Sequence, residues 1–523
     1  MNFSPNDPAF IFFQYFVSKY DVLKLNLNQR WVDIVGALLL YATVLIYQGY
    51  QYGQSDQSQI LPCLYAQDHP GAYAGDHYVQ YYLHSGFNER TIFHFLFRLL
   101  GYEMPVVVWI WHIALSIILI LAWIRIASFF IKHKGFQWLT IAMILILGFH
   151  TSTGSNEIYY NSLVPSLAAK AVASWAIVFW LTARFNSWSL LLMLVTLLQP
   201  LVGLQLFALT SVAHILDLIV HKKLKLFPWK PSLMYLVIGL PMLFLLLQHN
   251  GSGGDPEAFF RIIRFRLSHH FFASSFGFFN LLFGGIFALL ALYYMKQRLR
   301  AMMILIIAGC IVYEIGVEYF YHPIFLYTQW WKTTIWMEAF AFVAIGAVIE
   351  KNFQNVKLIN RFPFIIPVAL LILVSVYRLS GIRSSSPDYQ FPWSSKKSDE
   401  VDISEQASKL TPENSVFIVP IEFTAFRWYS KRSLYIDYKA MIHQEAFLKE
   451  WYKRIQNIYQ FGEEEAKGGF DLHNFSFYLL DDPSPMSFEY WRKLGITHIV
   501  STNPNIKDLT LVGHNRKYAI YKL

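Results

Sequence analysis

Charged side chains are scarce in this chain. Asp, Glu, Lys and Arg make up only 15% of its 523 residues, against about 25% in soluble globular proteins. Hydrophobic residues reach 55%, where soluble chains have about 45–50%. Because a soluble protein needs many charged groups on its surface, this composition excludes an ordinary soluble domain and indicates a membrane protein.

Cysteine is also nearly absent. Cys63 lies in an expected outer loop and Cys310 inside an expected span, and such a pair defines neither a disulfide framework nor a cysteine-based metal site. The net charge of +9 comes from Lys and Arg that gather in short loops between apolar runs, where they set membrane orientation. We therefore predict a lipid bilayer, and no nucleic acid, as partner.

Long apolar runs are abundant and predict about eleven membrane spans. A span needs about 20 apolar residues to cross a ~30 Å hydrocarbon core. The stretch from Trp188 to Val220 is too long for one crossing, and Gln199-Pro200 breaks it, because proline cannot continue a helix; it counts as two spans. The other nine runs are 33–52, 106–131, 137–151, 163–184, 231–248, 277–295, 301–320, 331–350 and 363–379.

The basic residues fall on one side of the membrane if eleven spans are counted. The positive-inside rule then places the N-terminus in the cytoplasm and the C-terminus outside. The outer segments are 53–104, 152–162, 249–276, 321–330 and everything after about 380. The basic residues are Lys19, Lys24, Arg30, Lys132, Lys134, Arg184, Lys222, Lys223, Lys225, Lys296, Arg298, Arg300, Lys351 and Lys357.

The pattern changes after the last span. We divide the chain into a transmembrane domain at 1–380, a linker at 381–396 and a small soluble α/β domain at 397–523. β-branched and aromatic runs predict strands in this last domain, and longer amphipathic runs predict helices. The expected strands are 416–419, 434–436, 497–500 and 518–521, and the expected helices are 398–410, 442–460 and 486–494.

The large first outer loop, 53–104, contains the main candidate residue. Asp56 follows the first span by a few residues, so its carboxylate is expected at the membrane surface. We assign it as the catalytic residue, with a helix terminator or solvated loop residue as the alternative.

Further along this loop, Asp68-His69 and Asp76-His77 repeat an acid next to a histidine. We assign Asp76 and His77 to substrate binding, while turn residues are the alternative. The two pairs suit a divalent cation, but their spacing defines no ligand set, so no metal or other cofactor is predicted. An interfacial amphipathic helix follows, with a polar stripe formed by Arg90, His94 and Arg98 that faces either outward or into a site.

The outer loop 249–276 carries cations on the side that the topology rule disfavours. Arginine pairs bidentately with phosphate, which is a physical reason for cations in this place. Anionic lipid headgroups are a competing ligand, and histidines also suit the membrane interface. The residues assigned to substrate binding here are Arg264, Arg266, His269 and His270.

Ionisable residues inside the expected spans form a further set. Such groups are costly at that depth unless they are paired or face water, so they are either internal ion pairs or part of a site. Lys332, at the head of a late span, is assigned to substrate binding. The set is Lys170, Glu314, Glu318, His322, Lys332 and Glu338.

Together these motifs resemble the GT-C glycosyltransferase superfamily, and most closely an uncharacterised set of bacterial polytopic membrane proteins grouped with it. The resemblance covers nearly the whole chain. It rests on YGQSDQSQILP, DHPGAYAGDHYV, SHHF, TPENSVFIVP, FRWYSKRSLYIDYK and EWYKRI.

The resemblance implies a GT-C-like helical bundle in the bacterial cytoplasmic membrane, with the C-terminal domain periplasmic or extracellular. It also implies sugar transfer from a polyprenyl-phosphate donor to an acceptor on the outer face. Asp56 matches the loop acid, His269 and His270 match a histidine pair, and Lys332 stands where the family has arginine. Ser268 stands where the family has proline.

Two other functions remain open. A transporter or flippase for a lipid-linked or anionic solute would use the broken pair at Gln199-Pro200 and the buried charges. A non-catalytic assembly protein would dock a partner on the outer domain. A transporter is expected to show inverted repeats and charges near mid-membrane, whereas the polar residues here crowd the outer interface and no repeat is visible, which favours an enzyme.

Overall fold

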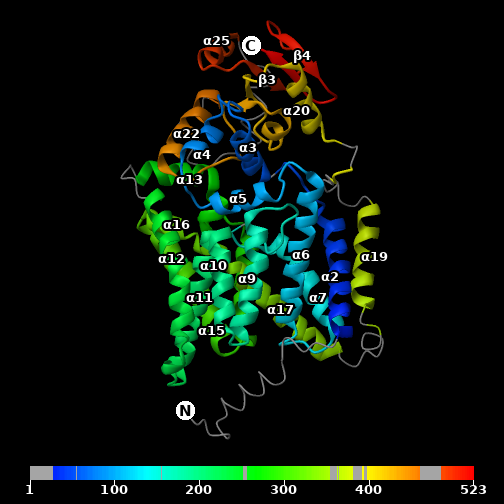
Figure 1. The fold of residues 1–523 in the computed structure, drawn as a ribbon, viewed down its shortest axis with the longest axis vertical. Helices are drawn as coiled ribbons and strands as arrows, with labels where there is room; N and C mark the ends of the chain where they lie inside the picture. The colour runs from blue at the N-terminus through cyan, green and yellow to red at the C-terminus, as the bar shows by residue number, and fades with distance from the viewer. Residues whose placement is uncertain are drawn as a thin grey trace.

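The computed structural model describes residues 27–54, 56–154, 156–250, 256–353, 362, 364–380, 391–393, 397–459 and 485–523. A helical bundle forms one end of the molecule and a small sheet the other, with the short helices of the first outer loop between them (Figure 1). Most of the expected linker, 381–396, and the basic residues Lys19, Lys24 and Lys357 lie outside the described residues.

Among the described residues, six helices are long and apolar enough to cross a membrane, and five more apolar helices are shorter. All eleven coincide in position with predicted spans, but the number of crossings stays a prediction. The six long spans lie in α2 (Leu27–Gln48), α6 (Pro105–Ala127), α11 (Pro200–Val220), α12 (Trp229–Asn250), α15 (Gln297–Glu314) and α17 (Thr334–Phe353). The shorter helices are α7 (Lys134–Ile146), α9 (Pro165–Leu181), α10 (Phe185–Leu198), α14 (Phe278–Tyr294) and α19 (Ile365–Leu379).

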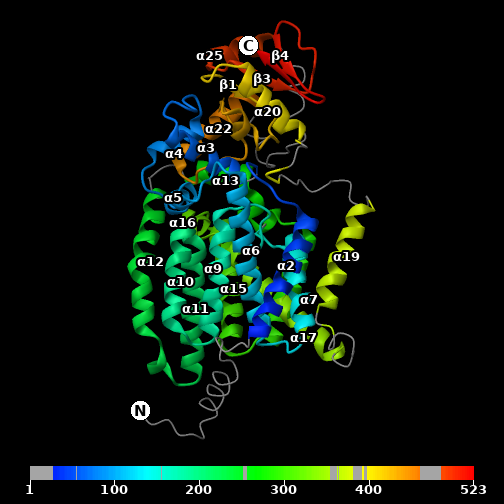
Figure 2. The ribbon, with the colours of Figure 1, turned by 45° about the vertical axis from the view of Figure 1, so that its right-hand side comes forward.

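The outer faces of these helices carry large apolar side chains. On α12, Val237 is 66% exposed and Phe244 62%, and on α19 Leu373 is 65% exposed. α12 and α19 lie at opposite sides of the bundle in Figure 2, so the apolar surface is not a single patch. Large apolar side chains exposed on several sides of the bundle are unfavourable in water and favourable in lipid. The chain is therefore a membrane protein.

The predicted break inside the bundle is confirmed. α10 ends at Leu198, Gln199 is extended with φ −152° and ψ 97°, and α11 begins at Pro200. Proline is tolerated there because the first helical N–H has no intrahelical partner. The break therefore places a helix N-terminus inside the bundle.

Three short helices form the layer above the bundle: α3 (Gln57–Asp68), α4 (His77–His84) and α5 (Thr91–Leu99). α5 is amphipathic as predicted, because Phe93 and Phe97 are buried while Phe95 and Leu99 are exposed. Of the expected polar stripe, Arg98 is exposed, whereas His94 is 1% exposed and its Nδ1 lies 2.5 Å from the hydroxyl of Tyr82.

The C-terminal region contains a five-stranded mixed sheet of order β2-β1-β3-β5-β4. β1 pairs in parallel with β2 and β3, and β5 pairs antiparallel with β3 and β4. Four strands match the predicted ranges closely, but β4 is one that the pattern missed. The strands are β1 (Val416–Ile418), β2 (Ser433–Leu434), β3 (His498–Ser501), β4 (Thr510–His514) and β5 (Ala519–Lys522).

Helices α20 (Asp399–Leu410), α22 (Glu445–Tyr459) and α25 (Pro485–Lys493) match the predicted ranges, and the short α21 (Phe426–Ser430) was not expected. One buried core runs through the first outer loop, α13 (Pro256–Phe271) and the C-terminal region. It includes Tyr73, Phe265, Trp451 and Ile499. The C-terminal region is thus packed onto the rest of the chain and shares its core.

A buried ion-pair network joins the same segments. The Arg427 guanidinium donates to Asp76 at 2.6 Å and to Asp437 at 2.5 Å, and the three side chains are at most 4% exposed. Close by, the Cβ of any residue larger than glycine at Gly53, where φ is +71°, would lie 2.5 Å from the Trp428 ring. The buried ion pairs and the close contact at Gly53 therefore restrict the first outer loop and the C-terminal region to one relative arrangement.

Replacing Arg427 by methionine is expected to destabilise the protein strongly. The change leaves two buried carboxylates without their cation, and removing one partner of a buried pair costs about 3–5 kcal/mol. Thermal unfolding of the detergent-purified protein measures the loss. Arg516→Met, which removes an exposed ion pair with Asp399, is the control and should unfold near the wild-type temperature. Equal unfolding temperatures for both variants would contradict the prediction.

Candidate functional site

A cavity of about 820 Å³ lies where the bundle meets the C-terminal region. The first outer loop, the α10–α11 junction, α13 and the segment 439–444 all contribute to its walls. Of the residues predicted for the site, it brings together Asp56, Arg266, His269, His270 and Lys332. Residues far apart in sequence therefore meet in one place.

Asp56 reaches this cavity from the position just before α3. An aspartate there usually accepts a hydrogen bond from the first helical turn, but the Asp56 side chain makes none. Its Oδ1 instead lies 3.0 Å from the Lys439 ammonium, and the side chain is 42% exposed. The carboxylate is thus open to a ligand in the cavity.

The surroundings of Asp56 keep it ionised. Burial by itself would raise its pKa, but the Lys439 ammonium and the Arg90 guanidinium outweigh burial and hold the pKa below its ordinary value. The ionised carboxylate is the form that accepts a proton from a hydroxyl group. Asp56 therefore has the charge state of a general base at neutral pH.

Positive charge exceeds negative charge along the cavity. Six Lys or Arg residues face three Asp or Glu residues, a surplus of three positive charges. Unneutralised cations in a partly enclosed space favour an anionic ligand. The charged lining residues are Arg90, Lys170, Arg266, Lys332, Arg378, Lys439, Asp56, Glu89 and Glu157.

Lys332 is the cation most available to a ligand. Its backbone carbonyl accepts a hydrogen bond from the Asn156 side chain at 3.0 Å, which anchors the main chain. Its ammonium makes no hydrogen bond or ion pair with any residue in the part of the chain that the structure describes. An ammonium in this state has three donors to offer to an anion.

Lys170, by contrast, is fully engaged in the wall. Its ammonium donates to Asn156 Oδ1 at 2.7 Å, to the Tyr160 hydroxyl at 3.1 Å and to the backbone carbonyl of Glu157. Burial raises the pKa of Glu157 to about 7, while the nearby Lys170 acts against that rise. Lys170 and Glu157 therefore form part of the cavity wall near Asp56. The Lys170 ammonium is occupied by its neighbours, so it is less available to a ligand.

Three histidines line the cavity as neutral rings. Burial, together with the neighbouring cations, lowers the pKa of His269 to about 4, of His270 to about 2 and of His443 to about 3. His270 Nδ1 lies 3.2 Å from the Gly154 carbonyl. At neutral pH these rings serve as hydrogen-bond partners, so they add no positive charge.

The other part of the lining is apolar. It surrounds the first turn of α11, whose N-terminal end favours negative charge. The cavity thus combines charged groups with a hydrocarbon wall, which suits an amphiphilic anion. The apolar residues include Leu198, Pro200, Leu201, Val202, Leu246, Phe259, Ile263, Leu326 and Ile442.

Three predicted substrate-binding residues lie elsewhere. Asp76 is fully buried in the Arg427 network, and its oxygens also accept from the N–H groups of Val79 and Leu434. His77 stacks on Phe447 with ring centroids 4.9 Å apart. Arg264 pairs with Glu318 at 2.6 Å. None of the three lines the cavity, because ion pairs hold Asp76 and Arg264 and ring packing holds His77 elsewhere.

The main residue that sequence reasoning missed is Lys439. It is the last residue of FRWYSKRSLYIDYK, a segment that carried the family resemblance, so a signal was present but pointed to no role. His443 was missed as well. Arg90, whose stripe was expected to face either outward or a site, lines the cavity. The place of each of these three residues in the cavity depends on how the C-terminal region folds over the first outer loop.

No group of three or more His, Cys, Asp or Glu side chains able to hold a metal ion occurs in the described ranges. The cavity holds a carboxylate, Asp56, beside several cations. Such a site can remove a proton from a hydroxyl group and stabilise a negatively charged leaving group.

Comparison with known proteins gives limited guidance. A family model described as a domain of unknown function, DUF6798, matches residues 398–458. No curated protein matches the sequence. The crystal structure of ArnT from Cupriavidus metallidurans bound to undecaprenyl phosphate is 13% identical, covers 95% of this chain and 98% of ArnT, and has a TM-score of 0.34. The apo structure of the same protein is 14% identical with the same coverages and a TM-score of 0.31. Scores at this level do not establish a shared fold.

Lys332→Met is expected to weaken binding of a phosphate monoester to the purified protein about tenfold. A hydrogen bond to a charged group contributes about 1.5–3 kcal/mol, and 1.4 kcal/mol corresponds to a factor of ten. Calorimetric titration measures the affinity. Lys397→Met removes the same charge at an exposed pair with Glu405 and should bind like wild type. Equal affinities for the two variants would show that Lys332 does not meet the anion.

Proposed function

We propose that this protein is a membrane glycosyltransferase of the GT-C type, which transfers a sugar from a polyprenyl-phosphate donor to an acceptor on the outer face of the bacterial cytoplasmic membrane. Asp56 is its general base. The observation that carries the proposal is the meeting of Asp56 with a surplus of cations in a cavity that also has an apolar wall.

The position of the cavity supports a lipid-linked donor. A polyprenyl chain stays in hydrocarbon while its phosphate reacts, so the reacting groups must lie at the end of the bundle and not within the distant sheet. The first-loop residue Asp56 and the late-span residue Lys332 both lie there. The apolar wall receives the first isoprene units, and the cations receive the phosphate.

The reaction follows from this placement. Asp56 removes the proton of the acceptor hydroxyl while that oxygen forms a bond to the anomeric carbon of the sugar. The bond between this carbon and the phosphate oxygen breaks, and its electron pair leaves with the polyprenyl phosphate. The configuration at the anomeric carbon is inverted. A positioned base contributes about 10²–10⁴-fold to such a step.

The cations stabilise the departing phosphate. The Lys332 ammonium has no partner among the described residues. Arg266 is held in place by a 2.6 Å hydrogen bond from its Nε to the Tyr438 carbonyl and by stacking 4.0 Å over the Tyr438 ring. The neutral ring of His269 adds a hydrogen-bonding group. Charge fixed in advance around a leaving group lowers the barrier because it needs no reorganisation during reaction.

The sequence supports this function in two further ways. The acid in the first outer loop next to the first span resembles GT-C enzymes, and the motifs around Asp56, the His269-His270 pair and the segment 426–439 resemble an uncharacterised bacterial set grouped with them. The distribution of Lys and Arg in the loops places the cavity end of the bundle outside the cytoplasm. The segment 397–523 is then extracytoplasmic and forms part of the site.

A transporter or flippase is the second candidate, because the broken helix pair at Gln199-Pro200 lines the cavity. A transporter moves its ligand intact, so Asp56 would bind or release protons without bond cleavage. Proteoliposomes that hold a sugar-linked polyprenyl phosphate, labelled in its sugar, on one leaflet separate the two functions. Movement across the bilayer without loss of sugar would favour transport.

A strain that lacks this protein is expected to lose one sugar modification of a surface glycan or lipid. Wild-type protein should restore it, while Asp56→Asn at the same membrane level should reduce it at least about 100-fold, because the general base is lost. Mass spectrometry of surface glycans and lipid-linked sugars measures the modification and identifies the sugar.

Asp508→Asn is the matched control, since Asp508 is an exposed surface carboxylate far along the chain in the C-terminal region. It should restore the modification fully. Full restoration by Asp56→Asn would remove Asp56 from the mechanism and favour the transport function.

A further inference from the structure

The position of Lys439, the partner of Asp56, is set by a tight turn. Oδ1 of Asp437 accepts the backbone N–H of Lys439 at 2.6 Å and that of Ala440 at 3.2 Å. This side-chain-to-backbone pattern fixes the chain direction two residues after an aspartate. The Trp451 indole N–H also donates to the Asp437 carbonyl at 2.9 Å, so the turn is held from both sides.

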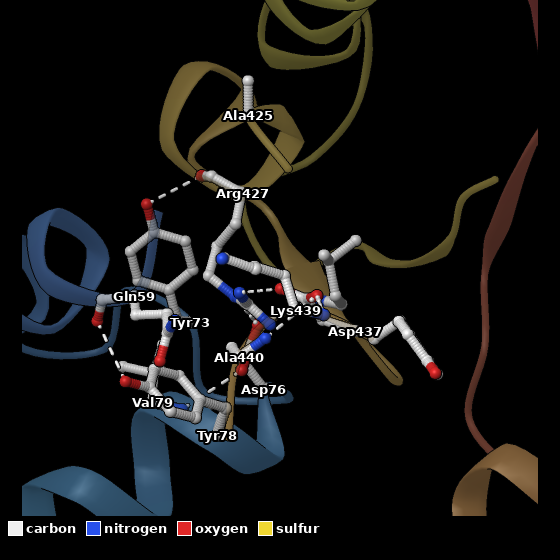
Figure 3. A network of polar contacts seen from close by, with 12 residues as sticks. Gln59, Tyr73, Asp76, Tyr78, Val79, Ala425, Arg427, Asp437, Lys439 and Ala440 are labelled. Atoms are coloured by element: carbon white, nitrogen blue, oxygen red, sulfur yellow. Dashed lines mark hydrogen bonds and ion pairs between the residues drawn. The ribbon is translucent and has the colours of Figure 1, made fainter. Parts of the chain in front are cut away.

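The other oxygen of Asp437 belongs to the buried network. Oδ2 lies 2.5 Å from Nη1 of Arg427, whose Nε donates to Asp76 Oδ2 at 2.6 Å. Figure 3 shows Arg427 between the two carboxylates, with Lys439 beside Asp437. Arginine spans two acceptors in this way because its planar fork has donors on two edges.

The far end of the network returns to the loop that carries Asp56. Asp76 accepts from Val79 N–H at the start of α4, and the Tyr78 hydroxyl donates to the Gln59 carbonyl at 3.1 Å. Gln59 belongs to α3, which begins next to Asp56. One chain of contacts therefore joins the two sides of the Asp56–Lys439 pair.

We propose that Asp76, Arg427 and Asp437 are positioning residues, which hold the Lys439 ammonium against the Asp56 carboxylate. The proposal rests on the proposed function, in which Asp56 is the base. None of the three residues touches the cavity contents. They act through the turn at 437–440.

A fixed ammonium matters because lysine is long and flexible. The Lys439 side chain is 32% exposed, and solvent exposure would let it leave Asp56 for water or for another anion. With the turn held, the ammonium stays at the carboxylate before the acceptor arrives. Loss of the turn would raise the protonated fraction of Asp56.

Several other charged or titratable groups act on Asp56, and they come from several elements around the cavity. Because so many groups influence Asp56, loss of activity alone would not identify the network. The test must therefore measure whether the pKa of Asp56 rises or falls. They are Arg90 before α5, His270 on α13, Glu157 in the loop before α9, Lys170 on α9 and Lys332 after α16 (Pro323–Thr328).

The test is labelling of Asp56 by a hydrophobic carbodiimide, which reacts with the protonated carboxyl, read by mass spectrometry of the purified full-length protein over a range of pH. Lys439→Met should be labelled about tenfold faster at neutral pH, since one pKa unit is a factor of ten in protonation. Asp437→Ala should shift labelling in the same direction. Asp399→Ala, which removes an exposed ion pair, should leave it unchanged.

The sign of the shift separates positioning from a direct charge effect. Removing the negative charge of Asp437 would by itself lower the pKa of Asp56 and slow labelling, whereas displacing Lys439 speeds it. In the double variant Asp437→Ala/Lys439→Met, labelling should equal that of Lys439→Met alone. Unchanged or slower labelling of Asp437→Ala, or a further increase in the double variant, overturns the proposal.

Arg427→Lys provides a second route if Asp437→Ala fails to fold. It keeps the charge but loses the fork that reaches both carboxylates, so labelling should again speed up, and wild-type labelling would overturn the proposal. Because labelling uses neither donor nor acceptor, the two ideas fail separately. If the wild-type protein shows no transfer activity, the proposed function is wrong. The positioning role of Asp76, Arg427 and Asp437 is tested by the labelling series alone.

Discussion

A guanidinium that is 2% exposed needs partners that compensate for its lost hydration, and Arg427 has two carboxylates in this role. Asp437 is its near neighbour in sequence, but Asp76 lies 351 positions away. Arg427 must pair with Asp76 and Asp437 at the same time. The first outer loop and the C-terminal region can therefore pack against each other in only one relative position. The cavity exists between these segments and the bundle, so its geometry depends on this one buried cation.

The site resolves a conflict between charge and hydrocarbon. Ionisable groups are costly inside a bilayer, yet a lipid-linked phosphate needs cations next to an apolar wall. The fold places the cations where the bundle ends, engages Lys170 within the wall and leaves the Lys332 ammonium free among the described residues. The histidines stay neutral in these surroundings, so a change of pH near 7 alters Glu157 before it alters the rings.

Periodic patterns predicted the local structure well. The break at Gln199-Pro200 and the strands at β1, β3 and β5 follow from short-range effects, since proline ends a helix and buried β-branched runs favour strands. β4 escaped because Thr510–His514 is largely exposed and contains Gly513, so it lacks the apolar alternation of a half-buried strand. Asp76 was misread for a related reason: a Gly-Asp-His run looks like a polar loop, and nothing nearby shows that Arg427 will cover it.

The sequence by itself therefore determined the membrane class, the position of the apolar helices and the candidacy of Asp56, since composition and spacing act over a few residues. Only the tertiary structure decided which charges share a cavity. It places Lys439 and His443 in the cavity wall, whereas Asp76, His77 and Arg264 lie outside that wall. Ion pairing and burial depend on groups that are hundreds of residues apart in sequence, and no local pattern records which distant partner a side chain will meet.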